Sequence, residues 1–236
     1  MERSPLAPDI LFAIGPVPIG RQVVTSWAIM AFLVLLSAAA FGFRHRSATA
    51  GEPGLLQSAL ELLVETLASQ VEAVLRCDPW PHLPLLGTLF LFLATANLAA
   101  VIPGVTPPTS HLETPAALAL TVLVAVHVEG FRARGLGGHL RHYLEPTPFM
   151  LPLHLVSEIS RTFALAVRLF GNMMSHELVI AIILLLAGFL VPVPFLLMAI
   201  LIGLIQAYIF TVLAAVFLAA ALGERARQAD GEEVAK

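Results

Sequence analysis

The sequence predicts an all-α integral membrane protein, with about five membrane-embedded helices and one amphipathic helix at the membrane interface. Of its 236 residues, 58% are hydrophobic and only 12% are charged, and the mean hydropathy is +0.88. Ordinary soluble domains carry about 25% charged residues. A chain this apolar needs lipid around it, so we treat residues 1–236 as a single membrane domain.

Long stretches without charge mark the predicted spans. A spanning helix needs roughly 20 mostly apolar residues, and each central charge costs ~2.5–3.5 kcal/mol. An extracytoplasmic N-terminus at 1–21 precedes a first span at 22–43. Residues 83–130 are expected to form a hairpin around a Pro-Gly-Val-Thr-Pro-Pro link. A second helical hairpin is expected at 146–222, where two prolines, Pro192 and Pro194, interrupt the apolar run.

Residues 55–76 have a different pattern from the spans. Leucine and valine recur there at helical spacing, and Glu61, Glu65 and Glu72 occupy another face. This pattern predicts an amphipathic helix on the cytoplasmic membrane surface or against a partner protein. The acidic face is atypical for binding to anionic lipid, which favours the partner.

The basic residues predict the orientation, because Lys and Arg accumulate in cytoplasmic loops. Both hairpin turns lack them, and the polar tail at 223–236 contains several. The basic residues that share one predicted side are Arg44, Arg46, Arg132, Arg134, Arg141, Arg225, Arg227 and Lys236. We therefore expect the N-terminus outside and the C-terminus in the cytoplasm.

Several function classes are disfavoured. The net charge is −3 and the basic residues are scattered, unlike the basic patch of a nucleic-acid-binding protein. Cys77 is the only cysteine, which excludes a disulfide framework and a cysteine-rich metal site. No two histidines recur at a depth suited to a haem. We expect the glycines of 135–138 to form a flexible loop and not a phosphate-binding site, since no phosphate-binding motif surrounds them. We expect no cofactor, no metal and no nucleic-acid partner.

Ionisable side chains within the apolar segment 154–177 are the main functional candidates, because such groups are costly at membrane depth. At 100° per residue, one polar stripe occupies about 80° of an ideal helix. Its members are His154, Glu158, Arg161, Leu165, Arg168, Asn172 and His176. Glu177 projects about 180° from Arg168, so the acid and the arginine serve different surfaces of one helix.

The candidates have different chemistry. Arg168 stays protonated, so it acts as a fixed charge and not as a proton carrier. Glu177 can exchange a proton and, with Asn172, His176 and Gln206, could border a water-filled path. One alternative is that Arg168 snorkels to the interface or pairs permanently with Glu158. Apolar sequence continues well beyond Arg168, which favours the functional interpretation.

A separate structural role is expected near the cytoplasmic end of this segment. Glu158 and Arg161 have the i,i+3 spacing at which opposite charges meet on one helix face. We therefore predict a structural ion pair between them.

The string Arg-Leu-Phe-Gly-Asn-Met at 168–173 resembles the signature of subunit a of F-type ATP synthases. The lead-in at 157–161, Ser-Glu-Ile-Ser-Arg, is similar to the same family. Two further segments also match: Asn97-Leu98 through Pro103-Gly104 resembles the end of the family's first hairpin helix, and Gln206-Ala207-Tyr208-Ile209-Phe210 its last helix. The resemblance thus extends along most of the chain.

The resemblance implies a stator subunit of the membrane sector of a rotary ATP synthase. In that family two half-channels carry ions, here expected to be protons, to and from carboxylates on a ring of c subunits. The last two long helices would form a hairpin against this c-ring. The other implied partners are the lipid bilayer, the peripheral-stalk b subunits and, indirectly, the soluble catalytic sector. The expected location is a bacterial inner membrane, and the chain itself would bind no nucleotide.

The resemblance also assigns residue roles. Arg168 corresponds to the catalytic arginine, which faces the ring carboxylate and blocks a direct leak. Asn172, Glu177 and Gln206 match polar positions of the ion path, and Ser175, His176, His154 and Glu158 complete our candidates for it. The chain departs from the family pattern elsewhere. His154 replaces an acid common in relatives, His111 replaces an aspartate, and Thr162 and Ala164 replace a proline and a serine.

Two alternatives from other classes were weighed. A secondary transporter or small ion channel would also place polar groups in the membrane, but the chain has no detectable repeat pair for alternating access. An intramembrane hydrolase could use Ser175 with His176. Adjacent residues point about 100° apart on a helix, which disfavours a nucleophile and base pair. The stator interpretation therefore ranks first.

Overall fold

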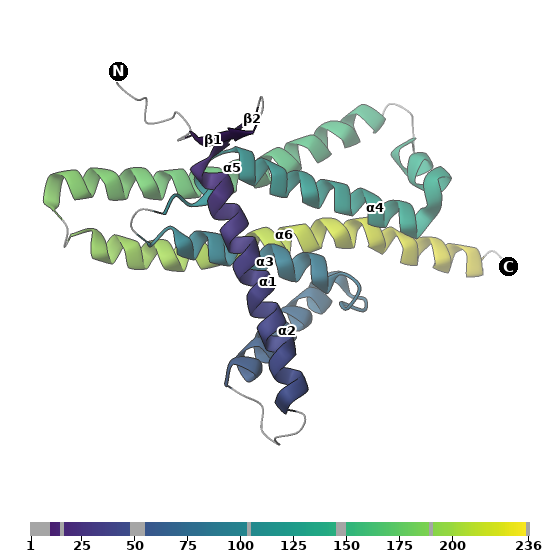
Figure 1. Cartoon of the computed structure of the whole chain (residues 1–236). Coiled ribbons are helices and arrows are strands. Elements are labelled where there is room, and N and C mark those ends of the chain that lie inside the picture. The colour runs from purple at the N-terminus through teal and green to yellow at the C-terminus, as the bar shows by residue number, and fades with distance from the viewer. Residues whose placement is uncertain are drawn as a thin grey trace. The chain divides into compact units, whose positions relative to one another are not determined.

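The structure is a computed structural model, and it describes residues 10–14, 17–47, 55–102, 105–144, 150–188 and 191–234. Within these ranges it contains six α-helices, which confirms the predicted all-α membrane class (Figure 1). The elements in chain order are β1 (Ile10–Ile14), β2 (Val17–Gly20), α1 (Arg21–Ser47), α2 (Leu55–Leu75), α3 (Leu83–Ala99), the short 3-10 helix η1 (Pro108–Ser110), α4 (Glu113–Leu144), α5 (Met150–Ala187) and α6 (Pro192–Val234).

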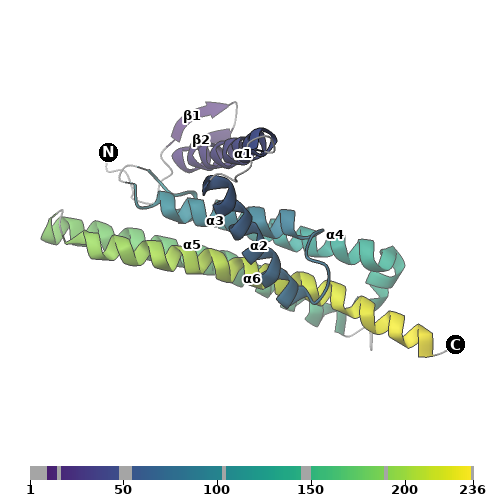
Figure 2. The ribbon, with the colours of Figure 1, turned by 90° about the horizontal axis from the view of Figure 1, so that it is seen from below.

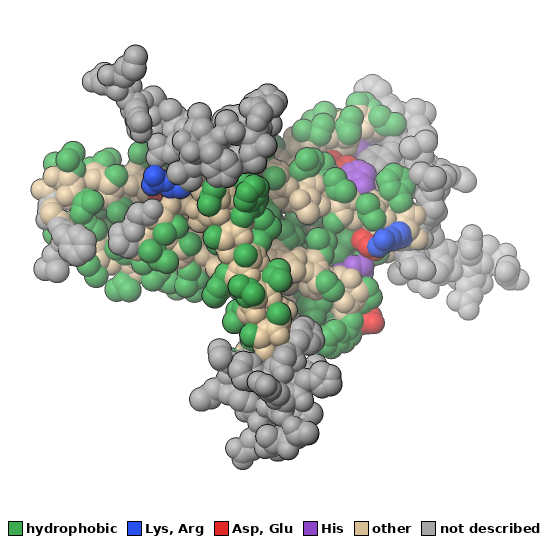
Figure 3. Space-filling model, in the orientation of Figure 1, with side chains coloured by type: hydrophobic (Ala, Val, Ile, Leu, Met, Phe, Trp, Pro, Cys, Tyr) green, Lys and Arg blue, Asp and Glu red, His purple; other side chains and the backbone are tan. Residues whose placement is uncertain are grey.

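Four helices of the described chain are long and apolar enough to cross a membrane. The spanning segments are Arg21–Ala39 of α1, Glu113–Arg132 of α4, Leu151–Leu186 of α5 and Pro192–Leu222 of α6. α3 is also apolar but has only 17 residues, or about 25 Å at ~1.5 Å per residue, slightly less than the ~30 Å hydrocarbon core. On the face drawn in Figure 3, hydrophobic side chains cover much of the described surface, as expected for lipid or partner contact.

The helices extend into two polar segments of the chain, one of which was expected to be a loop. The glycine-rich segment predicted as a flexible loop is helical, because α4 continues to Leu144. α6 likewise runs into the polar tail as far as Val234. In both segments no proline interrupts the helix, and most residues other than glycine are good helix formers, which allows the preceding helix to propagate.

A two-stranded hairpin precedes the first helix and was not predicted. β1 and β2 pair antiparallel, with Ile14 opposite Val17 and Ile10 opposite Gly20, and an irregularity between Ile10 and Phe12. The sequence analysis assigned no secondary structure to this N-terminal region. The hairpin leads directly into α1, which contacts β2.

The chain divides into two compact units, and each is described by itself. The first unit comprises Met1–Glu61, Leu91–His111 and Gly171–Ala207. It holds the β-hairpin, α1, the later part of α3, η1, the later part of α5 and the first part of α6. α1 contacts η1, and the parts of α5 and α6 in this unit run antiparallel on either side of a short connection (Figures 1 and 2).

The second unit comprises Leu62–Phe90, Leu112–Phe170 and Tyr208–Lys236. Its core is formed by leucine, valine and phenylalanine side chains from four helices: Leu86 and Leu89 of α3, Val122 of α4, Leu165 and Leu169 of α5, and Phe210 and Leu218 of α6. The Tyr208 hydroxyl of α6 donates a hydrogen bond to Gln70 Oε1 of α2, at 3.0 Å. The amphipathic helix α2 is thereby tied to the last apolar helix.

Candidate ion-path site

Arg168 lies on the exposed side of α5, in the second unit. Its neighbours Leu165 and Leu169 are buried in the core of that unit, at 3% and 1% exposure, whereas the arginine side chain is exposed. In the part of the chain that the structure describes, no hydrogen bond or ion pair engages its guanidinium. Glu158 lies ten residues away on the same helix, about 15 Å along the axis at ~1.5 Å per residue. A permanent pair with Glu158 therefore finds no support.

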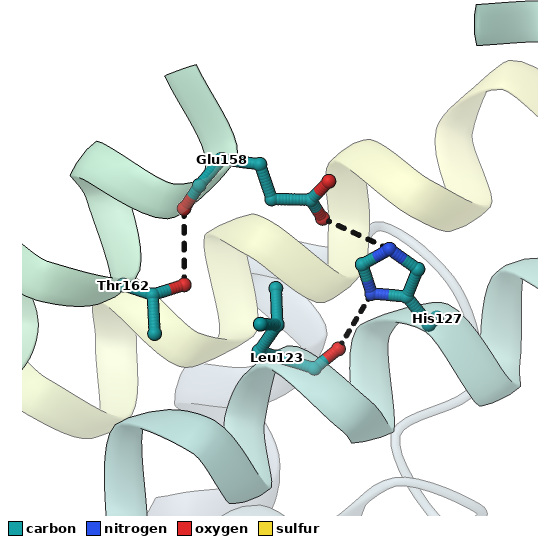
Figure 4. A network of polar contacts seen from close by, with 4 residues as sticks. All are labelled: Leu123, His127, Glu158 and Thr162. Carbon is teal, nitrogen blue, oxygen red and sulfur yellow. Dashed lines mark hydrogen bonds and ion pairs between the residues drawn. The ribbon is translucent and has the colours of Figure 1, made fainter. Parts of the chain in front are cut away.

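Glu158 instead contacts α4. Its Oε1 lies 3.4 Å from Nε2 of His127, and both side chains are half-buried (Figure 4). The guanidinium of Arg161 lies 4.8 Å from the centroid of the Phe217 ring of α6, a cation–π arrangement. The ion pair between Glu158 and Arg161 stays a prediction. His154, one turn before Glu158, is half-buried.

Glu177 lies on the later part of α5, in the first unit, where its side chain is half-buried. It lies close to the Ser110 hydroxyl and within electrostatic range of the His111 imidazole. The Ser110 hydroxyl donates to the Pro107 carbonyl, at 2.8 Å. This bond uses the one proton of the hydroxyl, and the oxygen keeps an acceptor site. Ser110 can therefore accept a hydrogen bond from Glu177 when that carboxyl group carries a proton.

A buried polar cluster of the first unit joins α3, η1 and α6. Asn97 Nδ2 donates to the Gly203 carbonyl at 2.8 Å, and Thr109 Oγ1 donates to Asn97 Oδ1 at 3.2 Å. Asn97 and Thr109 are buried, at 4% and 0% exposure. Because both the nitrogen and the oxygen of the Asn97 side-chain amide form hydrogen bonds, the cluster fixes η1 and α6 against α3.

Gln206 lies one turn beyond Gly203 on α6 and is buried, at 7% exposure. Its amide nitrogen Nε2 has no hydrogen-bond partner among the described residues. An unsatisfied buried amide costs ~1–3 kcal/mol. A side chain selected only for packing would not carry this cost, which favours a functional role for Gln206.

The remaining predicted path residues lie on α5 in the first unit. Asn172 and His176 are half-buried, and Ser175 is exposed. The Ser175 hydroxyl donates to the Gly171 carbonyl at 2.6 Å, which ties it to its own helix. Among the described residues no group of three or more His, Cys, Asp or Glu side chains is placed to hold a metal ion.

Some contacts of the candidate residues were not predicted. The sequence singled out Glu158, Glu177 and Gln206 but not the neighbours that the structure gives them. Neither His127 nor Ser110 was among the candidates from the sequence. Periodicity along one helix shows which side chains share a face, but not which residues of another helix meet that face.

The fold and these residues together define a multi-pass membrane protein with ionisable side chains on membrane-spanning helices, the class that includes ion-translocating subunits. The chain belongs to the ATP synthase subunit a family. The family model described as ATP synthase A chain matches residues 23–219, which include every site residue discussed above.

Similar proteins cover nearly the whole chain. A protein of Bradyrhizobium sp. named ATP synthase subunit a 2 is 53% identical over 227 residues, covering 96% of this chain and 100% of its own. The ATP synthase subunit a of Albidiferax ferrireducens is 44% identical, covering 97% and 99% of the two chains. A subunit a 1 of Hahella chejuensis is 49% identical, covering 89% and 87%. The resemblance read from the signature residues is thereby confirmed.

Proposed function

We propose that this chain is the ion-conducting stator of its ATP synthase, with Arg168 as a fixed charge that separates two half-channels. The observation that carries the proposal is the Arg168 side chain, exposed on a spanning helix and without an ion-pair partner in the described chain. A permanent cation at membrane depth is expensive unless an anion meets it. The carboxylate of a c-ring subunit is the partner that fits, because it reaches Arg168 transiently as the ring turns.

Glu177 and Gln206 are proposed to line the outer half-channel, together with Asn172, Ser175 and His176. The contact between Ser110 and Glu177 and the unsatisfied amide of Gln206 support this assignment. His154 and Glu158 are proposed for the inner half-channel. This division requires the N-terminus outside and the C-terminus in the cytoplasm, as the basic residues predict.

The assembly and location follow from the same proposal. The c-ring and the peripheral-stalk b subunits are the membrane-sector partners, and the soluble catalytic sector is coupled through them. The coupling ion is proposed to be the proton, and the membrane a bacterial inner membrane. One charge crossing 100 mV yields about 2.3 kcal/mol, so several ions must pass for each ATP. An arginine that prevents leakage therefore preserves the coupling.

Replacing Arg168 with Ala tests the proposal in the assembled complex, reconstituted in vesicles. We expect ion-driven ATP synthesis to be lost and passive ion leak to rise, because no fixed cation then separates the half-channels. Arg132→Ala is the matched control, since Arg132 is an exposed arginine paired with Glu129 at 2.9 Å and such surface pairs contribute only ~0–1 kcal/mol. Retained coupled synthesis in Arg168→Ala would overturn the proposal.

A further inference from the structure

The contact between His127 and Glu158 links two helices at a position that the proposed function does not yet explain. His127 belongs to α4 and Glu158 to α5, and both lie in the second unit. The imidazole Nε2 is 3.4 Å from the carboxylate Oε1, and the side chains are 31% and 21% exposed. Figure 4 shows the ring lying between the Glu158 carboxylate and the backbone of its own helix.

The backbone contact of His127 determines where the ring carries its proton. Nδ1 lies 2.8 Å from the Leu123 carbonyl oxygen. A carbonyl oxygen only accepts hydrogen bonds, so Nδ1 must be the protonated donor. Nε2 is then the nitrogen whose proton comes and goes, and it is the nitrogen that faces Glu158.

This arrangement favours one shared proton. If Glu158 is ionised, a deprotonated Nε2 would direct its lone pair at the carboxylate, which is repulsive. If Glu158 is protonated, its hydroxyl can donate to a deprotonated Nε2. The two favourable states are therefore imidazolium with carboxylate and imidazole with carboxylic acid, and they differ only in the position of a single proton.

Other charged, titratable and aromatic side chains lie on the same helices as this pair. On α4, Glu129 is paired with Arg132 at 2.9 Å, and the Phe131 ring lies 6.4 Å from the His127 ring. On α5, Arg161 lies over Phe217 of α6, and His154 is one turn before Glu158. The Thr162 hydroxyl donates to the backbone carbonyl of Glu158, at 3.0 Å, and not to its carboxylate.

We infer that His127 and Glu158 form a proton-exchanging pair of the inner half-channel. The inference rests on the proposed function and adds His127 as a residue of the ion path. In the direction of synthesis, the pair passes its shared proton to inner-phase water and becomes imidazole with carboxylate, of net charge −1, the repulsive arrangement described above, which favours uptake of another proton. It then takes up the next proton released near Arg168, about 15 Å away along α5 at ~1.5 Å per residue, through intervening water. Nε2 and Oε1 are the atoms that bind the proton.

The inference is tested with the complete complex in inverted vesicles, where the bath is the inner phase. ATP-driven proton pumping is measured while bath pH is varied from about 5 to 8, the range over which an unperturbed imidazole changes charge. The variants are Glu158→Gln, His127→Gln and the double variant, with His82→Gln as the control histidine. Every pumping rate is divided by the wild-type rate at the same pH. This ratio removes the pH dependence of the soluble sector, which all variants share.

We expect the ratio for each single variant to change with inner pH by at least ~10-fold, less than the ~10²–10⁴-fold of an obligatory general acid, because water also reaches the path. The double variant should change no more than either single variant, since all three remove the same shared proton. The ratio for His82→Gln should stay flat. A uniform loss at every pH would indicate a packing role and overturn the inference.

Assembly is checked by co-purification of the ring and the soluble sector. If a single variant does not assemble, the exchanged variant, His127→Glu with Glu158→His, decides instead. Its pumping should follow inner pH as the wild type does, and a flat response would overturn the inference. Arg168→Ala in the same vesicles separates the two proposals. If Arg168→Ala loses coupling while the rate ratios of the His127 and Glu158 variants do not change with pH, only the proposed role of His127 and Glu158 is overturned.

Discussion

Cys77 lies in the segment between α2 and α3, outside the spanning helices, and the reactivity of its thiol can be measured there. Partial burial, and then the neighbouring Asp78 carboxylate, raise the pKa of its thiol. The thiolate is the nucleophile in alkylation, so a raised pKa lowers the reactive fraction at neutral pH. Since this is the only cysteine, alkylation of the chain measures one site.

Replacing Asp78 with Asn should therefore speed alkylation of Cys77. We expect the rate with a maleimide at neutral pH to rise by about 1.4- to fivefold, equivalent to the ~0.2–1 kcal/mol of an exposed charge interaction. The rate is followed against pH in the detergent-solubilised complex. Asp78→Glu keeps the charge and should react like the wild type. An unchanged rate in Asp78→Asn would show that burial alone depresses the reactivity.

The sequence could predict contacts of a site residue within its own helix, but not its contacts with another helix. Glu158 was assigned a partner three residues away, Arg161, because local spacing is all that a sequence displays. The contact that the structure gives lies on another helix, at His127. By contrast, Arg168 could be singled out from the sequence, because its signature and its membrane depth are both local properties.

Helix positions could be predicted more completely than helix ends. α2 at Leu55–Leu75 lies where the amphipathic pattern places a helix, because its periodicity is strong. The continuation of α4 to Leu144 was missed. Glycines lower helix propensity by only ~1 kcal/mol each, and a preceding helix can offset that cost. The Asn97 cluster could not be predicted from the sequence either, since it forms only where α3, η1 and α6 come together.

Gly203 allows α6 to lie close against Asn97 of α3 in this cluster. A Cβ at this position would lie 2.9 Å from Asn97 Cβ, closer than real side chains approach. Gly203→Ala should therefore push the helices apart, break the bond from Asn97 to the Gly203 carbonyl, and destabilise the fold by ~1–3 kcal/mol. The measurement is thermal dissociation of the purified complex.

Gly87→Ala serves as the control for this substitution. Gly87 is also a helical glycine, in α3, but nothing lies within 4 Å of a Cβ built there. The added methyl group should be neutral or slightly stabilising, because alanine is favoured over glycine in helices by ~0.5–1 kcal/mol. Equal behaviour of the two variants would show that the contact at Gly203 relaxes without cost.

Across the described helices many leucine, valine and phenylalanine side chains are exposed, and Arg168 lies exposed among such side chains on α5. A soluble protein would aggregate with so many exposed leucines, valines and phenylalanines. Lipid accounts for most of this surface. It does not account for the arginine, for which the proposed function supplies an anion from another protein. The membrane class was therefore predictable from composition, whereas the surface that meets the partner depends on the geometry around one side chain.

Gly171 tests whether a partner packs closely at this surface. It lies three residues after Arg168, hence about 60° away around the helix. Nothing lies within 4 Å of a Cβ built at this position, so the chain itself tolerates alanine there. Within α5, alanine should even be favoured by ~0.5–1 kcal/mol.

If a ring of helices slides past this face, however, the added methyl group meets the ring backbone. We then expect ATP synthesis by Gly171→Ala to fall several-fold, because overpacking costs on the order of 1–3 kcal/mol. Gly87→Ala, equally open, should retain the wild-type rate. Full synthesis in Gly171→Ala, with normal assembly, would place the close contact elsewhere on the chain.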